Sequence, residues 1–220
     1  MSILQKYEES IYKDILFKTE MISAILDDNK SKTRRPIKPQ PRPENTYCGG
    51  LVTHSKDESL LGCVGFMKSP LARVGYDFRR PKYQVGDILW VRETWAHISN
   101  DDGEPCDRFV YKASDEAIDF ELTQPDWKWR PSIHMPKAAA RIFLRVTDLG
   151  AERLQEITED DIKKEGTAYP QGLDSWASAY ARLWDSTLKT ADIPYYGWNA
   201  NPWVWVYGFE KTVKPKDWEK

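Results

Sequence analysis

A basic segment near the start of the sequence places one hydroxyl within reach of a lysine. The motif KSKTRR spans residues 30–35, and residues 30–42 contain six basic residues and no acidic one. Thr33 follows Lys30 by three positions. A hydroxyl beside a lysine that can lose its proton is a nucleophile with its base. The pair therefore predicts hydrolytic or acyl-transfer chemistry, and the alternative interpretation is a solvated, Pro-rich basic loop.

A carboxylate that could complete this pair lies far along the sequence. Glu165 stands directly before Gly166, at the predicted end of a helix. There it could orient the lysine or relay its proton. Spacing alone does not bring residue 165 to residue 30, so the other interpretation makes Lys30 and Glu165 ordinary surface charges.

The remaining cations of the basic segment have the chemistry of phosphate ligands. The set is Arg34, Arg35, Lys38 and Arg42. Guanidinium groups bind phosphate through two parallel hydrogen bonds. The alternative is that an arginine of this set pairs with Asp27, Asp28 or Glu93.

A second charged pair stands among tryptophans. Arg92 and Glu93 follow a predicted buried strand, between Trp90 and Trp95. Charged groups among aromatic rings are typical of a pocket that stacks a nucleobase. They are equally typical of a structural ion pair at the end of a strand.

The possible metal ligands do not form a known pattern. They are Cys48, His54, Cys63 and Cys106. Their spacing matches no common zinc motif, and His134 has no obvious partner. We therefore expect neither a metal nor another cofactor.

Composition excludes some classes of protein. The 220 residues carry 32 basic and 34 acidic side chains, a net charge of −2, which excludes a generally polycationic binder. Three cysteines without a CxxC motif argue against a disulfide framework. No apolar run approaches the ~18 residues that span a bilayer. We expect a cytoplasmic protein that binds no membrane.

The pattern of apolar residues predicts an α+β fold. Short apolar runs predict strands of one curved sheet or barrel at residues 15–17, 88–91, 108–113, 140–146 and 203–207. Helical spacing predicts helices at residues 21–26, within 147–166 and at 173–188, with Thr19 and Thr158 as N-caps. Residues 36–82 contain many prolines and glycines, which predicts an irregular segment.

Four blocks of the sequence resemble ASCH domains, members of the PUA-like superfamily. The first joins residues 15–26 to the motif KSKTRR. The others are QVGDILWVRETW at residues 84–95, LQEITEDDIKKEG at 154–166 and NPWVWV at 201–206. The last is similar to the closing strand of larger, often phage-encoded, members. The four blocks stand in the family's order across most of residues 14–211.

The resemblance implies a fold and an activity. It implies one domain over residues 1–220, a PUA-like small β-barrel flanked by helices, with a long irregular insertion at about residues 43–82. Small bacterial members are amidohydrolases that remove the acetyl group of N4-acetylcytidine. Their catalytic Lys, Thr and Glu correspond to Lys30, Thr33 and Glu165 in this sequence.

The same resemblance leaves a second function open. Other relatives bind RNA or modified bases, and some are similar to ribonucleases. The alternative is therefore a non-catalytic binding module, or a ribonuclease, that uses the same basic cleft. In either case the expected partner is a nucleoside or a nucleic acid, RNA rather than DNA. The chain is about twice as long as the small amidohydrolases, which is the main departure from them.

Overall fold

The computed structural model describes residues 12–99, 105–114, 117, 128–168, 175–216 and 218. The chain divides into two compact units, and both are discontinuous in sequence. Unit 1 comprises residues 1–30, 86–145 and 210–220, and unit 2 comprises residues 31–85 and 146–209. Strands and helices alternate through both units, which confirms the predicted α+β class.

Unit 1 contains a parallel strand pair and a β-hairpin. β1 (Tyr12–Leu16) pairs in parallel with β6 (Ile88–Arg92), and β6 pairs antiparallel with the first residues of β9 (Phe143–Arg153). β7 (Trp95–Ser99) pairs with β8 (Pro105–Tyr111) in a two-stranded sheet, and Trp95 also forms an isolated antiparallel bridge with Arg130. The unit also contains α2 (Thr19–Leu26) and the 3₁₀ turns Ser132–His134 and Lys137–Ala139.

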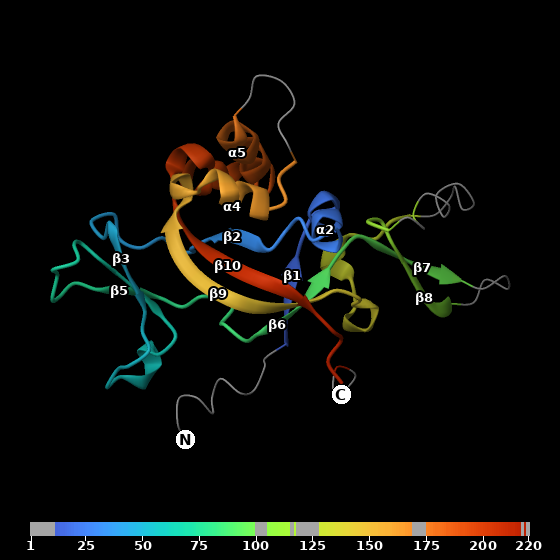
Figure 1. Cartoon of the computed structure of the whole chain (residues 1–220), viewed down its shortest axis with the longest axis horizontal. Coiled ribbons are helices and arrows are strands. Elements are labelled where there is room, and N and C mark those ends of the chain that lie inside the picture. The colour runs from blue at the N-terminus through green and yellow to red at the C-terminus, as the bar shows by residue number, and fades with distance from the viewer. Residues whose placement is uncertain are drawn as a thin grey trace. The chain divides into compact units, whose positions relative to one another are not determined.

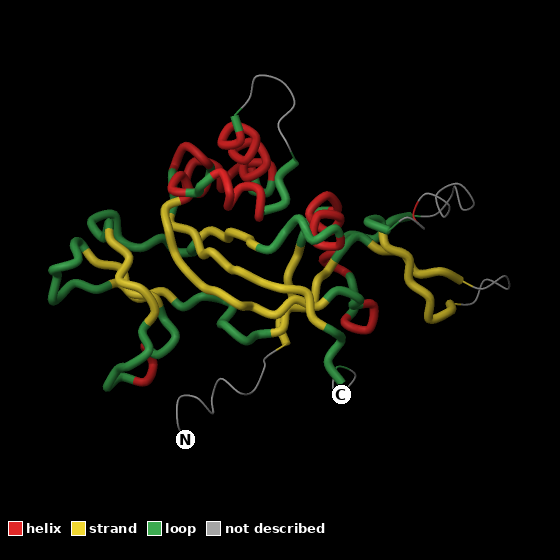
Figure 2. Tube along the Cα trace, viewed as in Figure 1, coloured by secondary structure: helices red, strands yellow, loops and turns green. Residues whose placement is uncertain are grey.

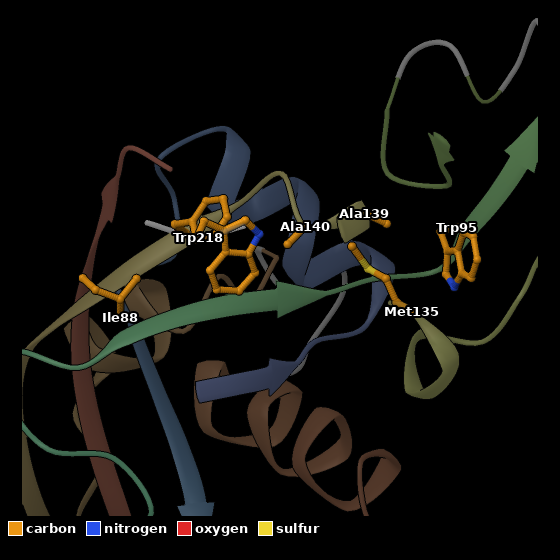
Figure 3. Packing of buried hydrophobic residues seen from close by; sticks show 7 residues of the cluster. Ile88, Trp95, Met135, Ala139, Ala140 and Trp218 are labelled. Carbon is orange, nitrogen blue, oxygen red and sulfur yellow. The ribbon is translucent and has the colours of Figure 1, made fainter. Parts of the chain in front are cut away.

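Aromatic and small side chains form the core of unit 1 (Figure 3). Trp218 packs its ring edge-on against Phe143, with the ring centroids 4.9 Å apart, and lies in the same cluster as Ile88 and Met135. The ammonium of Lys137 lies 4.2 Å from the Trp218 ring centroid. Large aromatic area thus compensates for the modest apolar fraction of the sequence.

Unit 2 is a curved sheet with helices over one face. β2 (Lys32–Pro36) pairs antiparallel with β10 (Trp203–Thr212), which neighbours β9 in the sheet. Figures 1 and 2 show α4 (Glu159–Lys164) and α5 (Trp176–Ser186) over this sheet. Ile162, Tyr180 and Trp184 pack there against Val204 and Val206 of β10. The unit also contains α6 (Ile193–Tyr196) and the 3₁₀ turns Glu58–Leu60, Leu154–Glu156, Thr190–Asp192 and Trp198–Ala200.

A small sheet occupies the segment that looked irregular. β3 (Tyr47–Leu51), β4 (Val64–Met67) and β5 (Asp77–Arg79) form a three-stranded antiparallel sheet in unit 2. The prediction that residues 43–82 form an irregular insertion was therefore wrong where these three strands lie. These strands are only three to five residues long, and glycines interrupt the alternation of apolar residues that would have indicated them.

Three further predictions need correction. Residues 108–113 do not join the other predicted strands in one sheet, because β8 hydrogen-bonds to β7. Residues 147–153 were predicted to be partly helical but continue β9, which lies beside β10. Pairing with a neighbouring strand outweighs local helical spacing there. Lys18, rather than Thr19, is the N-cap of α2, whereas the Thr158 hydroxyl does accept the Asp161 N–H and caps α4.

The five-stranded order β1-β6-β9-β10-β2 includes four of the five predicted strands. A closed barrel is not assigned among the described strands, so the barrel stays a prediction. The single-domain interpretation of residues 1–220 also stays a prediction. No helix in the described parts of the chain is long and apolar enough to cross a membrane.

Candidate functional site

The basic motif forms a strand, and the strand separates its side chains onto two faces. In β2, Thr33 stands opposite Tyr207 of β10 and Arg34 stands opposite Val206. Side chains alternate along a strand, and residues opposite each other share a face. Lys32 and Arg34 therefore lie on the face that carries α4 and α5, while Thr33 and Arg35 lie on the other face.

The helix-side face holds a buried arginine among three carboxylates. Arg34 is 2% exposed. Its Nε lies 2.7 Å from Oε1 of Glu152 in β9. Its two terminal nitrogens lie 3.1 Å from Oδ2 of Asp161 and 3.2 Å from Oε1 of Glu165. One planar guanidinium thus joins β2 to β9 and to α4.

Charge and burial act on these groups in opposite directions. Burial raises the pKa of Glu152, although Arg34 lowers it. Burial also acts on Asp161, but hydrogen bonds from Lys32 and Arg34 outweigh it and lower its pKa. Burial acts to lower the pKa of Arg34, while the nearby negative charges, chiefly those of Glu165 and Glu152, together act more strongly to raise it. The guanidinium therefore stays charged, and the cluster is an ion network.

Glu165 ends α4 and is 4% exposed. Besides Arg34, the hydroxyl of Tyr180 in α5 lies 3.4 Å from its Oε1. Burial, with the nearby Glu165 carboxylate, raises the pKa of Tyr180 well above 10. The phenol is therefore a neutral donor toward Glu165.

The opposite face of β2 carries the predicted nucleophile. Thr33 is 1% exposed, and its Oγ1 accepts a hydrogen bond of 2.6 Å from Nη1 of Arg35. Tyr207 is 1% exposed, packs edge-on against Tyr83 and has a pKa raised by burial. A cation in contact with a hydroxyl favours negative charge on that oxygen. This contact is the feature of β2 that most directly supports chemistry at Thr33.

Lys30 belongs to unit 1, whereas Thr33 and Glu165 belong to unit 2. The side chain of Lys30 is 3% exposed, and its Nζ lies 5.5 Å from the ring centroid of Phe17. Its backbone N–H donates to the Ala24 carbonyl at the end of α2. Burial rules out the interpretation of Lys30 and Glu165 as ordinary surface charges, while convergence of all three residues stays a prediction.

Acidic partners compensate much of the basic segment. Lys32 pairs with Asp161 at 2.7 Å, and Lys38 pairs with Asp192 at 2.9 Å. Arg42 receives weaker contacts, 3.8 Å from Glu44 and 3.9 Å from Asp77. The local positive charge of the sequence is therefore much smaller in the folded chain, which weakens the charge argument for a phosphate site in this segment.

The predicted charged pair Arg92 and Glu93 lies in unit 1, and each of the two residues forms an ion pair. Glu93 is 1% exposed and binds both Nε and Nη2 of Arg141, each at 2.9 Å. Arg92 pairs with Asp14 at 3.3 Å. Trp95 is buried in the core, and Arg130 lies 5.2 Å from its ring centroid. A substrate-binding role for Arg92, Glu93 and Trp95 stays a prediction.

Potential metal ligands do not gather in the described parts of the chain, where no group of three or more histidine, cysteine or acidic side chains could hold an ion. Cys48 and Cys63 are free thiols, and the side chain of Cys106 lies outside the described residues. His54 is exposed and contacts the Thr53 hydroxyl.

Several partners were not predicted. Glu152, Tyr180 and Arg141 gave no sequence signal, because their partners lie far away in the chain. Asp161 was not predicted as a partner of the basic segment. Its carboxylate binds Lys32 and Arg34, and its N–H donates to the Thr158 hydroxyl that caps α4.

Comparisons with known proteins show only weak similarity between this chain and other proteins. No family model matches the chain, and no curated protein matches it. Among solved structures, the chain is similar to an ASCH domain from Lactobacillus crispatus JV V101, with 11% identity and a TM-score of 0.38. That similarity covers 97% of this chain and 87% of the other.

A protein from Enterococcus faecalis V583 described by the family name DUF984 is also similar. Its identity is 10%, its TM-score is 0.39, and the coverage is 97% of this chain and 89% of that one. One of the two structures thus carries the family name that the four sequence blocks resemble. Similarity at this level carries no inference about function, and the proposals below depend on the residues themselves.

Proposed function

We propose that this chain is a hydrolase that cleaves the amide of an acylated cytosine nucleoside, such as N4-acetylcytidine, or of a related modified base. The observation that carries the proposal is the contact between the Arg35 guanidinium and the buried Thr33 hydroxyl. The Lys-x-x-Thr spacing of the basic motif, with its resemblance to the amidohydrolases, supplies the reaction class.

The reaction proceeds in two steps. Thr33 Oγ1 attacks the acyl carbonyl while Lys30 accepts its proton. The carbon–nitrogen bond then breaks, Lys30 returns the proton to the leaving amine, and the acyl group stays on Thr33 as an ester. Water hydrolyses this ester to acetate and free Thr33. Arg35 stabilises the negative charge that develops beside Thr33.

Glu165 has a positioning role in this proposal. Its contacts with Arg34 and Tyr180 fix its carboxylate at the end of α4, close to the first residues of β2, where the Ser31 N–H donates to the Lys164 carbonyl. We propose that the Glu165 carboxylate orients the Lys30 amine or relays its proton. Arg34 pairs with this carboxylate, so we do not assign it to phosphate binding.

The test measures the release of cytidine from N4-acetylcytidine. Wild type should release it, and Thr33→Ala and Lys30→Ala should each lose most of the activity. A nucleophile and its base act as a unit, so the double variant should be little worse than either single one. Lys30→Arg should also be inactive, because guanidinium stays protonated.

Matched controls separate chemistry from folding. Thr46 and Lys56 are exposed residues of unit 2, so Thr46→Ala and Lys56→Arg should leave activity unchanged. Circular dichroism checks that each variant is folded. If the wild type hydrolyses no acylated cytosine derivative, the proposal is wrong and the non-catalytic binding module becomes the better interpretation. If Lys30→Arg keeps full activity, the role assigned to Lys30 is wrong.

A further inference from the structure

The small sheet β3–β4–β5 has two different faces. One face carries Phe66, which is fully buried and packs edge-on against Trp203 and Trp205 of β10, with centroids 5.0 Å and 6.4 Å apart. Figure 1 shows this sheet extending from the strands of unit 2. The face with Phe66 thus anchors the small sheet within its unit.

The opposite face of the small sheet carries glycines and aromatic residues. Gly65 pairs with Gly50 on one side and with Phe78 on the other, so these three residues share this face. A Cβ on Gly65 would lie 3.3 Å from the Phe78 ring, whereas a Cβ on Gly50 would meet nothing within 4 Å. The Phe78 ring therefore lies over bare backbone, beside an open glycine.

Two tyrosines extend this surface. The Tyr76 ring stacks on Phe78, with an interplanar angle of 20° and the centroids 5.8 Å apart. Tyr47 stands opposite Met67, on the same face as Gly65. Tyr76 is 39% exposed and Tyr47 is 43% exposed. We call the surface formed by Tyr47, Tyr76 and Phe78 the aromatic platform.

Basic residues are frequent in the segment that carries Tyr76 and Phe78. Residues 68–82 contain five basic side chains and one acidic one, so this stretch carries +4 in a chain of net charge −2. Asp77, the single acid, already pairs with Arg79. The other cations, all exposed, are Lys68, Arg73, Arg80 and Lys82. Arg42, half-exposed, donates to the Gly75 and Tyr76 carbonyls.

We propose that the aromatic platform binds single-stranded nucleic acid. Exposed aromatic faces stack on bases that are not paired, and neighbouring lysines and arginines attract the phosphates. The charge of residues 68–82 selects an anionic partner, and the stacked rings select one with flat, accessible bases. This proposal does not depend on chemistry at Thr33, and it places nucleic-acid binding in the segment that the sequence left without a role.

The test is fluorescence anisotropy with labelled twelve-residue oligothymidylate and oligouridylate. Tyr76→Ala should weaken binding by between about five-fold and about a hundred-fold, the range for losing one stacked base. Tyr195→Ala is the matched control, because Tyr195 is also exposed, at 70%, but lies in α6. Tyr76→Phe keeps the ring and loses only the hydroxyl contact with the Ala72 carbonyl, so it should bind like wild type.

The salt dependence of oligonucleotide binding distinguishes the contribution of base stacking from that of phosphate contacts. Arg73→Ala should reduce the slope of log affinity against log salt by about 0.7, since each phosphate contact on a single strand releases about that many counterions. Tyr76→Ala should leave the slope unchanged, and so should Lys189→Ala, an exposed control. Thr33→Ala should bind like wild type, so loss of hydrolysis and loss of binding are separable.

Three results would overturn the inference. The first is no binding of either oligonucleotide at low salt, which would favour a protein partner for the platform. The second is equal weakening by Tyr76→Ala and Tyr195→Ala. The third is equal competition by the corresponding duplex, whose paired bases cannot stack on the rings, because binding would then depend on charge alone.

Discussion

Removal of the Arg34 guanidinium should destabilise the protein strongly. The substitution Arg34→Met keeps most of the side-chain volume but leaves three carboxylates without their shared cation, at Glu152, Asp161 and Glu165. Breaking a buried ion pair by removing one partner costs about 3–5 kcal/mol, because the other charge stays buried. Glu165, at 4% exposure, supplies most of that cost.

The magnitude should depend on pH in a defined direction. In the variant Glu152 loses the attraction of Arg34 that opposed burial, so its folded pKa, already raised by burial, rises further above its unfolded value. A group with a raised folded pKa binds protons more readily in the folded state, so the variant gains stability as pH falls. In wild type, the pKa of Asp161 is lowered in the folded state. This has the opposite effect on stability, which is lost as pH falls through that pKa. The difference between the two proteins should therefore be largest near pH 7 and smaller near pH 5.

Urea unfolding followed by tryptophan fluorescence measures this difference. The matched control is Lys163→Met, which breaks the exposed pair of Lys163 with Glu159 and should change stability little. Adding Glu165→Gln to Arg34→Met should recover part of the loss, since one uncompensated charge is removed. A loss below about 1 kcal/mol, or one that does not vary between pH 5 and pH 7, would refute the argument that Arg34 compensates buried charge.

Three further outcomes are expected. Glu93→Gln should destabilise by about 2–4 kcal/mol in urea unfolding, because Glu93 is 1% exposed and bidentate with Arg141, and an unchanged midpoint would contradict that. Tyr180→Phe should cost about 1 kcal/mol or less, since its 3.4 Å contact with Glu165 is long, and a larger loss would show a stronger bond. Thr33→Ser should retain part of the hydrolysis of N4-acetylcytidine that Thr33→Ala loses, because a hydroxyl remains.

The sequence predicted the elements whose signal is local. Apolar runs located β1, β6 and β10, helical spacing located α5, and the Thr158 cap located the start of α4. The basic motif gave no such signal. β2 carries four polar residues in succession, Lys32, Thr33, Arg34 and Arg35. It is a strand because its backbone pairs with β10 and its cations pair with distant carboxylates.

The candidate site shows the same limit. The sequence indicated Lys30, Thr33 and Glu165, but it suggested nearby acids as partners for the arginines. Arg34 instead finds carboxylates that lie 118, 127 and 131 positions away. Such pairs follow from the topology of the sheet, which no local pattern encodes. The four short stretches β2 to β5 were missed for the same physical reason, since glycines and charges stand where apolar alternation was expected.

The discontinuity of both units affects how the chain can fold during synthesis. Unit 2 begins at residue 31 but also needs residues 146–209, and unit 1 needs residues 210–220. Ribosomes add about 5–20 residues per second. Roughly ten to thirty seconds therefore pass between the synthesis of Thr33 and the synthesis of its strand partner Tyr207. During that interval β2 is an unpaired edge rich in cations, and this charge protects it from pairing with other nascent strands.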